Sequence, residues 1–272
     1  MDFSPPELAE LALDASAHAT PDEGTTVMEA VAFIAGEPHS QSPVCCCPVI
    51  AAVVRSAGAS RNYDTQNALC AFLFPLAQSK STPEVEALRA QRLVDYVMFD
   101  ALPNAFRRAQ THRPADLLAN LPALRPGTDP APHLAVLREL RWWTPTAASE
   151  LRLPTAKDGA HEVENLLLAY QASGQFPTLS RWIRVLRVLQ MDITFPGALS
   201  ALLEVGGPAS GKLDPALAAA RIAELVDRQR AWALRPGGQA CTRAEKHELF
   251  QARPFSEPAP PLWPSMLPNR KE

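Results

Sequence analysis

The densest set of potentially reactive side chains in this sequence lies in one short segment: Glu37, His39, Ser40, Cys45, Cys46 and Cys47. Its first four members are candidate ligand residues. A carboxylate, an imidazole and a thiol are ligands that zinc and related metal ions accept. The E-x-H-x5-C spacing is not a standard zinc pattern, so a complete site would need distant ligands such as Cys241 or His247. We expect no resident cofactor, and we keep a metal ion or another ligand at the four residues as a hypothesis.

Cys45 is also a candidate nucleophile, because it lies just before Pro48, where a helix is predicted to begin. Unpaired N–H groups and the dipole at a helix N-terminus favour a thiolate. A pair with His39 would still need a third, orienting group, which the sequence does not identify. The alternative is structural. Cysteines 45–47 would then pack as small apolar residues, and residues 37–40 would end one helix and turn the chain.

Two apolar helices must position this segment. Thr25 or Thr26 can cap the first, which is predicted to run to about Gly36. Pro48 suits the first position of the second, which Gly58 would end. The clearest helix elsewhere is predicted over residues 84–102, with Pro103 ending it.

The rest of the chain has apolar positions at helical spacing. Its 272 residues include only 12 glycines but 27 prolines, which can start and stop helices. The best strand-like run, residues 191–195, is too short to form a sheet. The sequence therefore predicts an all-α fold, a multi-helix bundle that can divide into two helical subdomains.

The candidate domain boundary is the segment from Arg125 to Pro132, which holds three prolines and a glycine. We predict an N-terminal helical domain over residues 1–125 that contains the loop from Glu37 to Pro48. A C-terminal helical domain follows over residues 133–252, and a proline-rich tail over residues 253–272.

Three further patterns fail on inspection. Residues 206–213 match G-x-x-x-x-G-K, but Leu213 stands where a phosphate-binding loop needs Ser or Thr. Residues 161–165 begin like the zinc-protease pattern H-E-x-x-H, but Asn165 replaces the second histidine. A helix-turn-helix with its turn at residues 154–159 would present glutamates to phosphates, so an αα-hairpin is favoured.

A basic amphipathic helix is predicted near residue 184. Its three arginines are spaced to lie along one side: Arg181, Arg184 and Arg187. Four apolar residues would occupy the other side: Trp182, Val185, Leu186 and Leu189. Such a face can bind an acidic partner, nucleic acid or a membrane surface. The alternative, which we favour, is a solvated face whose arginine stems cover the edge of the core.

Charge and hydropathy narrow the class of binding partner and the cellular compartment. The net charge of −3 gives no chain-wide footprint for nucleic acid. No run of 18 apolar residues is present and no signal peptide is recognised, so we expect neither a membrane span nor secretion. Five cysteines, three of them adjacent, make a poor disulfide framework. A reducing cytoplasm fits best.

Residues 28–54 resemble a motif of uncharacterised bacterial proteins, in which an apolar helix is followed by A-G-E-P-x-S, then P-x-C-x-x-P-V-I. The matching residues are Gly36, Glu37, Pro38, Ser40, Pro43, Cys45 and Pro48. The likeness covers at most the first half of the chain and implies no activity.

The expected function is that of a helical interaction or regulatory protein, because no catalytic constellation in the sequence is complete. It would act through a protein partner or by self-association. One alternative is an enzyme or a ligand-binding protein that uses the segment with Glu37, His39 and Cys45. A further alternative is a weak nucleic-acid binder that uses the helix with Arg181, Arg184 and Arg187.

Overall fold

The computed structural model describes residues 10–11, 13–58, 68–143, 153–189, 191–206 and 213–233. The fold is all-α, as predicted: this part of the chain forms α-helices and one π-helical segment, with a single isolated bridge between Leu13 and Thr25. None of the helices within these ranges combines the length and the apolar character that a membrane crossing requires. The proposed phosphate loop, the tail after residue 252, Cys241 and His247 lie outside the described residues.

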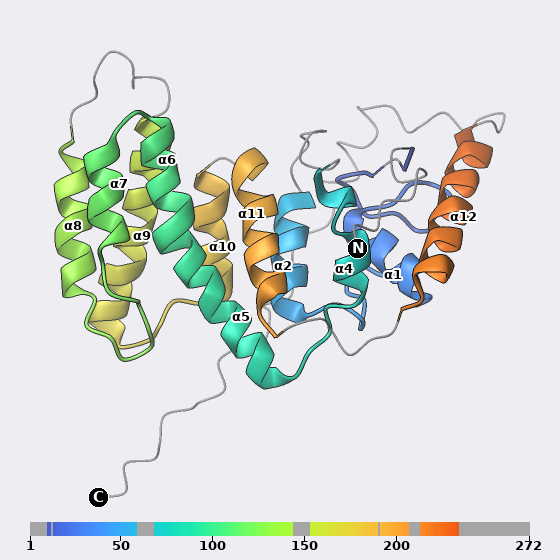
Figure 1. The fold of residues 1–272 in the computed structure, drawn as a ribbon, viewed down its shortest axis with the longest axis horizontal. Coiled ribbons are helices and arrows are strands. Elements are labelled where there is room, and N and C mark those ends of the chain that lie inside the picture. The colour runs from blue at the N-terminus through green and yellow to red at the C-terminus, as the bar shows by residue number, and fades with distance from the viewer. Residues whose placement is uncertain are drawn as a thin grey trace, which may run out of the picture.

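The helices form an elongated stack (Figure 1). Helices α6, α7, α8 and α9 gather at one end, and α1, α4 and α12 at the other, with α2, α10 and α11 between them. The bounds are α1 Val27–Ala35, α2 Pro48–Gly58, α4 Leu73–Ala77, α5 Pro83–Asp95, η2 Tyr96–Ala101, α6 Leu102–Arg108, α7 His112–Ala119, α8 Ala131–Arg141, α9 Leu153–Ser173, α10 Leu179–Val188, α11 Met191–Glu204 and α12 Pro215–Ala233.

The prediction that Pro103 ends a helix is wrong. Helix α5 continues through the π-helical segment η2 into α6, so a single rod runs from Pro83 to Arg108 (Figure 1). Pro103 cannot donate to the carbonyl four residues earlier, and its ring would clash there. The chain widens instead, and the N–H of Leu102 bonds to the carbonyl of Val97, five residues back. A wider turn thus absorbs the proline without ending the helix.

Two other local interpretations are corrected. Residues 191–195 are not a strand but the first turns of α11. Residues 154–159, the predicted turn of an αα-hairpin or helix-turn-helix, lie inside α9, which runs unbroken from Leu153 to Ser173. Tertiary packing against α6, α8 and α10 outweighs the weak turn propensity of one proline and one glycine.

The hydrophobic core runs through both halves of the sequence. Helices α10 and α11 pack against α2, and α12 packs against α1. Trp182 of α10 is the largest fully buried side chain in the described part of the chain. The predicted boundary at residues 125–132 lies between α7 and α8, which contact each other. That each half folds as its own domain stays a prediction.

A buried arginine ties three segments together. Arg89 of α5 is 2% exposed, and its Nη1 donates to the carbonyl of Ser79 at 2.5 Å and to Oγ of Ser81 at 3.1 Å. Its Nε donates to the carbonyl of Val205, just beyond α11, at 3.2 Å. These carbonyls follow the ends of α4 and α11, where helix dipoles favour a cation. Arg89 therefore fixes α4, α5 and α11 relative to one another.

We predict that Arg89→Met lowers the free energy of unfolding by about 2–4 kcal/mol, because it leaves buried carbonyls without a donor. Arg92→Met on the same helix is the matched control. Arg92 is partly exposed and pairs with Asp100 at 3.7 Å, so its loss should cost less than about 1 kcal/mol. Urea unfolding of both variants measures the difference, and equal losses would contradict the role assigned to Arg89.

Candidate functional site

The segment after α1 begins with a left-handed turn at Gly36 that ends the helix and packs against Arg221. Gly36 has φ 76°, and its N–H bonds to the carbonyl of Phe33 at 3.0 Å. The N–H of Glu37 bonds to the carbonyl of Ala32 at 2.9 Å, which completes a common left-handed helix stop. Arg221 of α12 reaches over this turn and donates to the carbonyl of Ile34 at 2.7 Å. A side chain at position 36 would occupy the space of that guanidinium group.

Glu37 and Cys45 come together, as one hypothesis requires. The Glu37 carboxylate accepts a hydrogen bond from the backbone N–H of Val44 at 2.6 Å and so closes the loop. Burial, with the Glu37 carboxylate adding to it, raises the pKa of the Cys45 thiol to about 12. The thiol is therefore protonated at neutral pH, whereas a nucleophile or a preformed metal ligand needs the thiolate.

The neighbouring side chains have structural partners. The Oγ of Ser40 accepts a hydrogen bond from the N–H of Ser42 at 3.0 Å, which is a local turn contact. Cys46 and Cys47 are buried in the core. The N–H of Cys47 donates to Oγ of Ser79 at 3.0 Å, which satisfies a free donor at the start of α2. The loop is thus held by helix-end contacts.

His39 does not join Glu37 and Cys45 but points to the segment before α1. Its Nε2 lies 3.1 Å from the carbonyl oxygen of His18 and 3.7 Å from Oε1 of Glu29. His18 lies between two carboxylates: its Nε2 is 3.3 Å from Asp14, and its Nδ1 is 3.6 Å from Glu29. The structure therefore shows an acid–imidazole cluster of Asp14, His18, Glu29 and His39.

The cluster is charged, with Glu29 buried and the other three side chains partly exposed. Burial alone would lower the pKa of His18, but the carboxylates of Asp14 and Glu29 outweigh it and raise the pKa to about 9. Burial alone would raise the pKa of Glu29, but His18 and the backbone N–H of Thr26 bring it below its usual range. His18 is thus an imidazolium ion paired with Glu29 at neutral pH. This ion pair fastens residues 14–18 to the first turn of α1.

One sequence signal could have revealed part of this cluster. Thr26-x-x-Glu29 is a capping box, with the Thr26 N–H bonded to Glu29 at 2.8 Å and the Glu29 N–H bonded to Thr26 Oγ1 at 3.3 Å. The helix cap at Thr26 was predicted from the sequence, but the role of Glu29 as its partner in the capping box was not. The partnership with His18 and His39 depends on tertiary contacts, so no spacing rule reports it.

Metal binding finds no support in the geometry. Among the residues that the structure describes, no group of three or more His, Cys, Asp or Glu side chains is arranged to hold a metal ion. His161 and Asn165 of the incomplete protease pattern lie on the exposed face of α9, with Asn165 Nδ2 3.2 Å from His161 Nε2.

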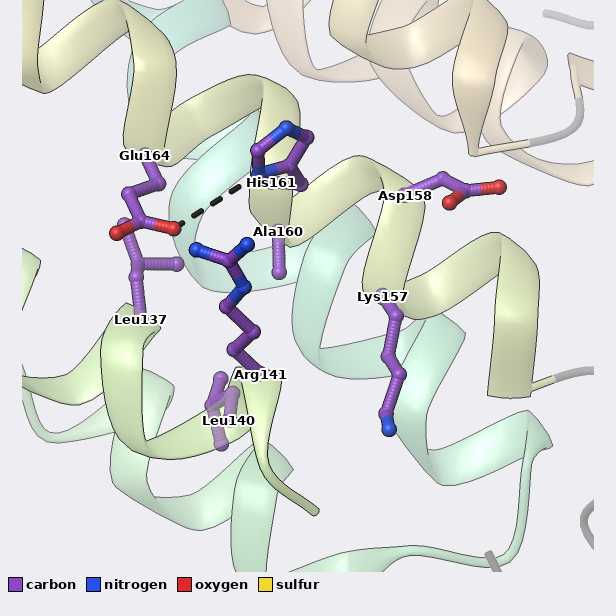
Figure 2. A pocket seen from close by; sticks show the side chains of 8 residues that line it. All are labelled: Leu137, Leu140, Arg141, Lys157, Asp158, Ala160, His161 and Glu164. Carbon is purple, nitrogen blue, oxygen red and sulfur yellow. Dashed lines mark ion pairs between the residues drawn. The ribbon is translucent and has the colours of Figure 1, made fainter. Parts of the chain in front are cut away.

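A pocket of about 190 Å³ lies between α8 and α9 (Figure 2). Buried apolar side chains form its floor, and charged ones its rim; together they are Leu137, Leu140, Arg141, Lys157, Asp158, Ala160, His161 and Glu164. Glu164 is 3.9 Å from Nδ1 of His161 and 3.6 Å from Nε of Arg138. Arg141 extends from α8 toward the Ala160 side of α9 in Figure 2. The pocket therefore combines an apolar floor with two cations, Arg141 and Lys157, and two carboxylates, Asp158 and Glu164.

A solvent-exposed tryptophan directly follows Arg141 in the sequence. Trp142, at the end of α8, is 80% exposed, the highest value among the large exposed apolar side chains that the structure describes. Its neighbour Trp143 is partly buried and lies under the guanidinium of Arg113, 5.8 Å from the ring centroid. Sequence reasoning missed Arg141, Trp142 and Lys157 as candidates. Two adjacent tryptophans at a helix end are the signal that was available, because both cannot face the core.

The predicted basic face on α10 is present. Arg181, Arg184 and Arg187 are exposed, while the four apolar residues Trp182, Val185, Leu186 and Leu189 are buried. Arg184 lies 3.4 Å from Glu162 of α9. Arg181 and Arg187 form no ion pair with any residue in the described ranges.

Comparison with known proteins adds no relative. No family model, no curated protein and no solved structure matches this chain.

We predict that Gly36→Ala lowers the free energy of unfolding by about 2–4 kcal/mol. The left-handed backbone accounts for about 1 kcal/mol, and displacement of the Arg221 guanidinium accounts for the remainder. Gly174→Ala is the matched control, since Gly174 has φ 69° but open space around it, and it should cost about 1 kcal/mol. The comparison uses urea unfolding. In a double-mutant cycle, Arg221→Ala should remove most of the extra cost of Gly36→Ala.

We predict that the His18 ion pair stabilises the fold at neutral but not at strongly alkaline pH. Because folding raises the pKa of His18 from 6.5 to about 9, its contribution is complete below pH 6.5 and is lost as the pH rises through 9. The loss amounts to about 3 kcal/mol at most. Between pH 6.5 and pH 10, the free energy of unfolding should therefore fall more for the wild type than for His18→Gln.

The exposed His161→Gln serves as the control and should keep the full pH dependence of the wild type. A titration of His18 by NMR measures the same pKa directly. A midpoint near 6.5 would contradict the buried ion pair.

Proposed function

We propose that this chain is a helical interaction protein that binds a protein partner at the α8/α9 groove, defined here as the pocket together with Trp142. The observation that carries the proposal is an 80% exposed tryptophan that directly follows Arg141 in the sequence, where Arg141 and Lys157 line a pocket with an apolar floor. Tryptophan and arginine are enriched among the residues that dominate binding energy at protein interfaces.

Packing supports a binding role for Trp142 over a structural one. Its large ring contributes little to the core, whereas Trp143 is held by Arg113. Exposure of an aromatic ring to water is unfavourable unless a partner covers it. We further propose a cytoplasmic location, which the reduced state of the adjacent Cys45, Cys46 and Cys47 supports, since none of these three described cysteines forms a disulfide.

The proposal predicts that Trp142→Ala changes the free energy of unfolding by less than about 0.5 kcal/mol, because the side chain is at the surface. Trp143→Ala, the matched control, should destabilise by more than about 1 kcal/mol through lost packing. Urea unfolding measures both. An equal loss in both variants would make Trp142 a structural residue and remove the reason for the proposal.

The binding itself is tested by photocrosslinking in the native cell. A photoreactive amino acid replaces Trp142 in one variant and the exposed Arg181 in another. Crosslinks should form at position 142 at a defined mass and should weaken when Leu140→Glu disrupts the pocket floor. A crosslink between two copies of this chain identifies self-association. Crosslinking at position 142 that does not exceed crosslinking at position 181 would contradict the proposed groove.

A further inference from the structure

We propose that the α8/α9 groove recognises an acidic segment of its partner, with carboxylates against Arg141 and Lys157 and an apolar residue over the floor. This inference rests on the proposed function, because it assigns the chemistry of the partner for the same groove. It follows from three properties of the pocket: its charges, its size and its floor.

No residue that the structure describes forms an ion pair with the two cations at the rim, Arg141 and Lys157. The Asp158 carboxylate, although it belongs to the same rim, points away from Arg141 and Lys157 in Figure 2. Glu164 already has His161 and Arg138 near it. The positive charge on the Arg141–Lys157 side is therefore left for a ligand.

The size of the pocket favours a peptide over a cofactor. Small-molecule sites usually measure roughly 300–1,000 Å³, whereas this pocket measures about 190 Å³. A space of this size accommodates a side chain or two, and the rest of a peptide would lie across the surface. The apolar floor of Leu137, Leu140 and Ala160 gives one such side chain a dry contact.

Arginine is well suited to the carboxylate. Its planar guanidinium can donate two parallel hydrogen bonds to a carboxylate, and lysine adds a second, less directional charge. Trp142 next to Arg141 can then cover an apolar neighbour of the acidic residue. A segment in which acidic and apolar residues alternate meets all three requirements.

The test uses fluorescent twelve-residue peptides with blocked ends and the full-length chain. One peptide alternates Glu and Leu, the second has Gln in place of Glu, and the third has Lys. Fluorescence anisotropy should show salt-dependent binding of the Glu peptide. The double variant Arg141→Ala/Lys157→Ala should weaken that binding at least tenfold. Arg181→Ala/Arg187→Ala, which removes the same charge from α10, should change it less than twofold.

Absence of binding by the Glu peptide, or equal weakening by the two double variants, would overturn the inference. Binding of the Gln or Lys peptide that depends on Leu140 and not on Arg141 would also overturn it, yet would leave a protein-binding groove in place. A single-stranded twelve-residue oligothymidylate is the last probe. If it binds through Arg141 and Lys157 while the Glu peptide does not, the groove recognises phosphates and the inference is wrong.

Discussion

The buried guanidinium of Arg89 is the interaction on which the central part of this structure depends. It is 2% exposed and bonds to backbone carbonyls after α4 and α11, so its charge is balanced by helix dipoles and not by a carboxylate. Ser79, whose carbonyl Arg89 holds, also accepts from the N–H of Cys47. Arg89 is thus linked through Ser79 to Cys47 at the start of α2, which also packs against α1, α10 and α11.

A second arginine also bonds to a carbonyl near a helix end, between α1 and α12. Arg221 donates to the carbonyl of Ile34 and thereby fastens α12 to the end of α1. Gly36 leaves room for that guanidinium group, so the glycine serves both the left-handed turn and the helix contact. Long-range contacts of this kind explain why a conspicuous run of reactive residue types can be structural. Glu37, Ser40 and the cysteines occupy a junction where two helix ends must be closed.

The fold could be predicted from the sequence to the extent that local patterns decide it. Thr26 and Pro48 mark helix starts in the sequence, and the structure has α1 and α2 there. Pro103 and residues 191–195 were misjudged, because a π-helical turn and core packing override local propensity. The partners of His39 could not be predicted, since the carbonyl of His18 and the carboxylate of Glu29 approach it only through tertiary contacts.

The contrast between the loop and the α8/α9 groove is the physical reason for placing the proposed binding role in the groove. In the loop, the thiol of Cys45 is held in its neutral form, and Glu37 and His39 have partners within the fold. In the groove, Arg141 and Trp142 lie where α8 ends and the core no longer covers them. A side chain that already has hydrogen-bond or ion-pair partners in the fold gains little free energy from contact with another protein. An exposed aromatic ring, or a cation that has no ion pair within the described residues, gains more. Residue type alone favoured the loop, but the partners that each side chain has in the folded chain favour the groove.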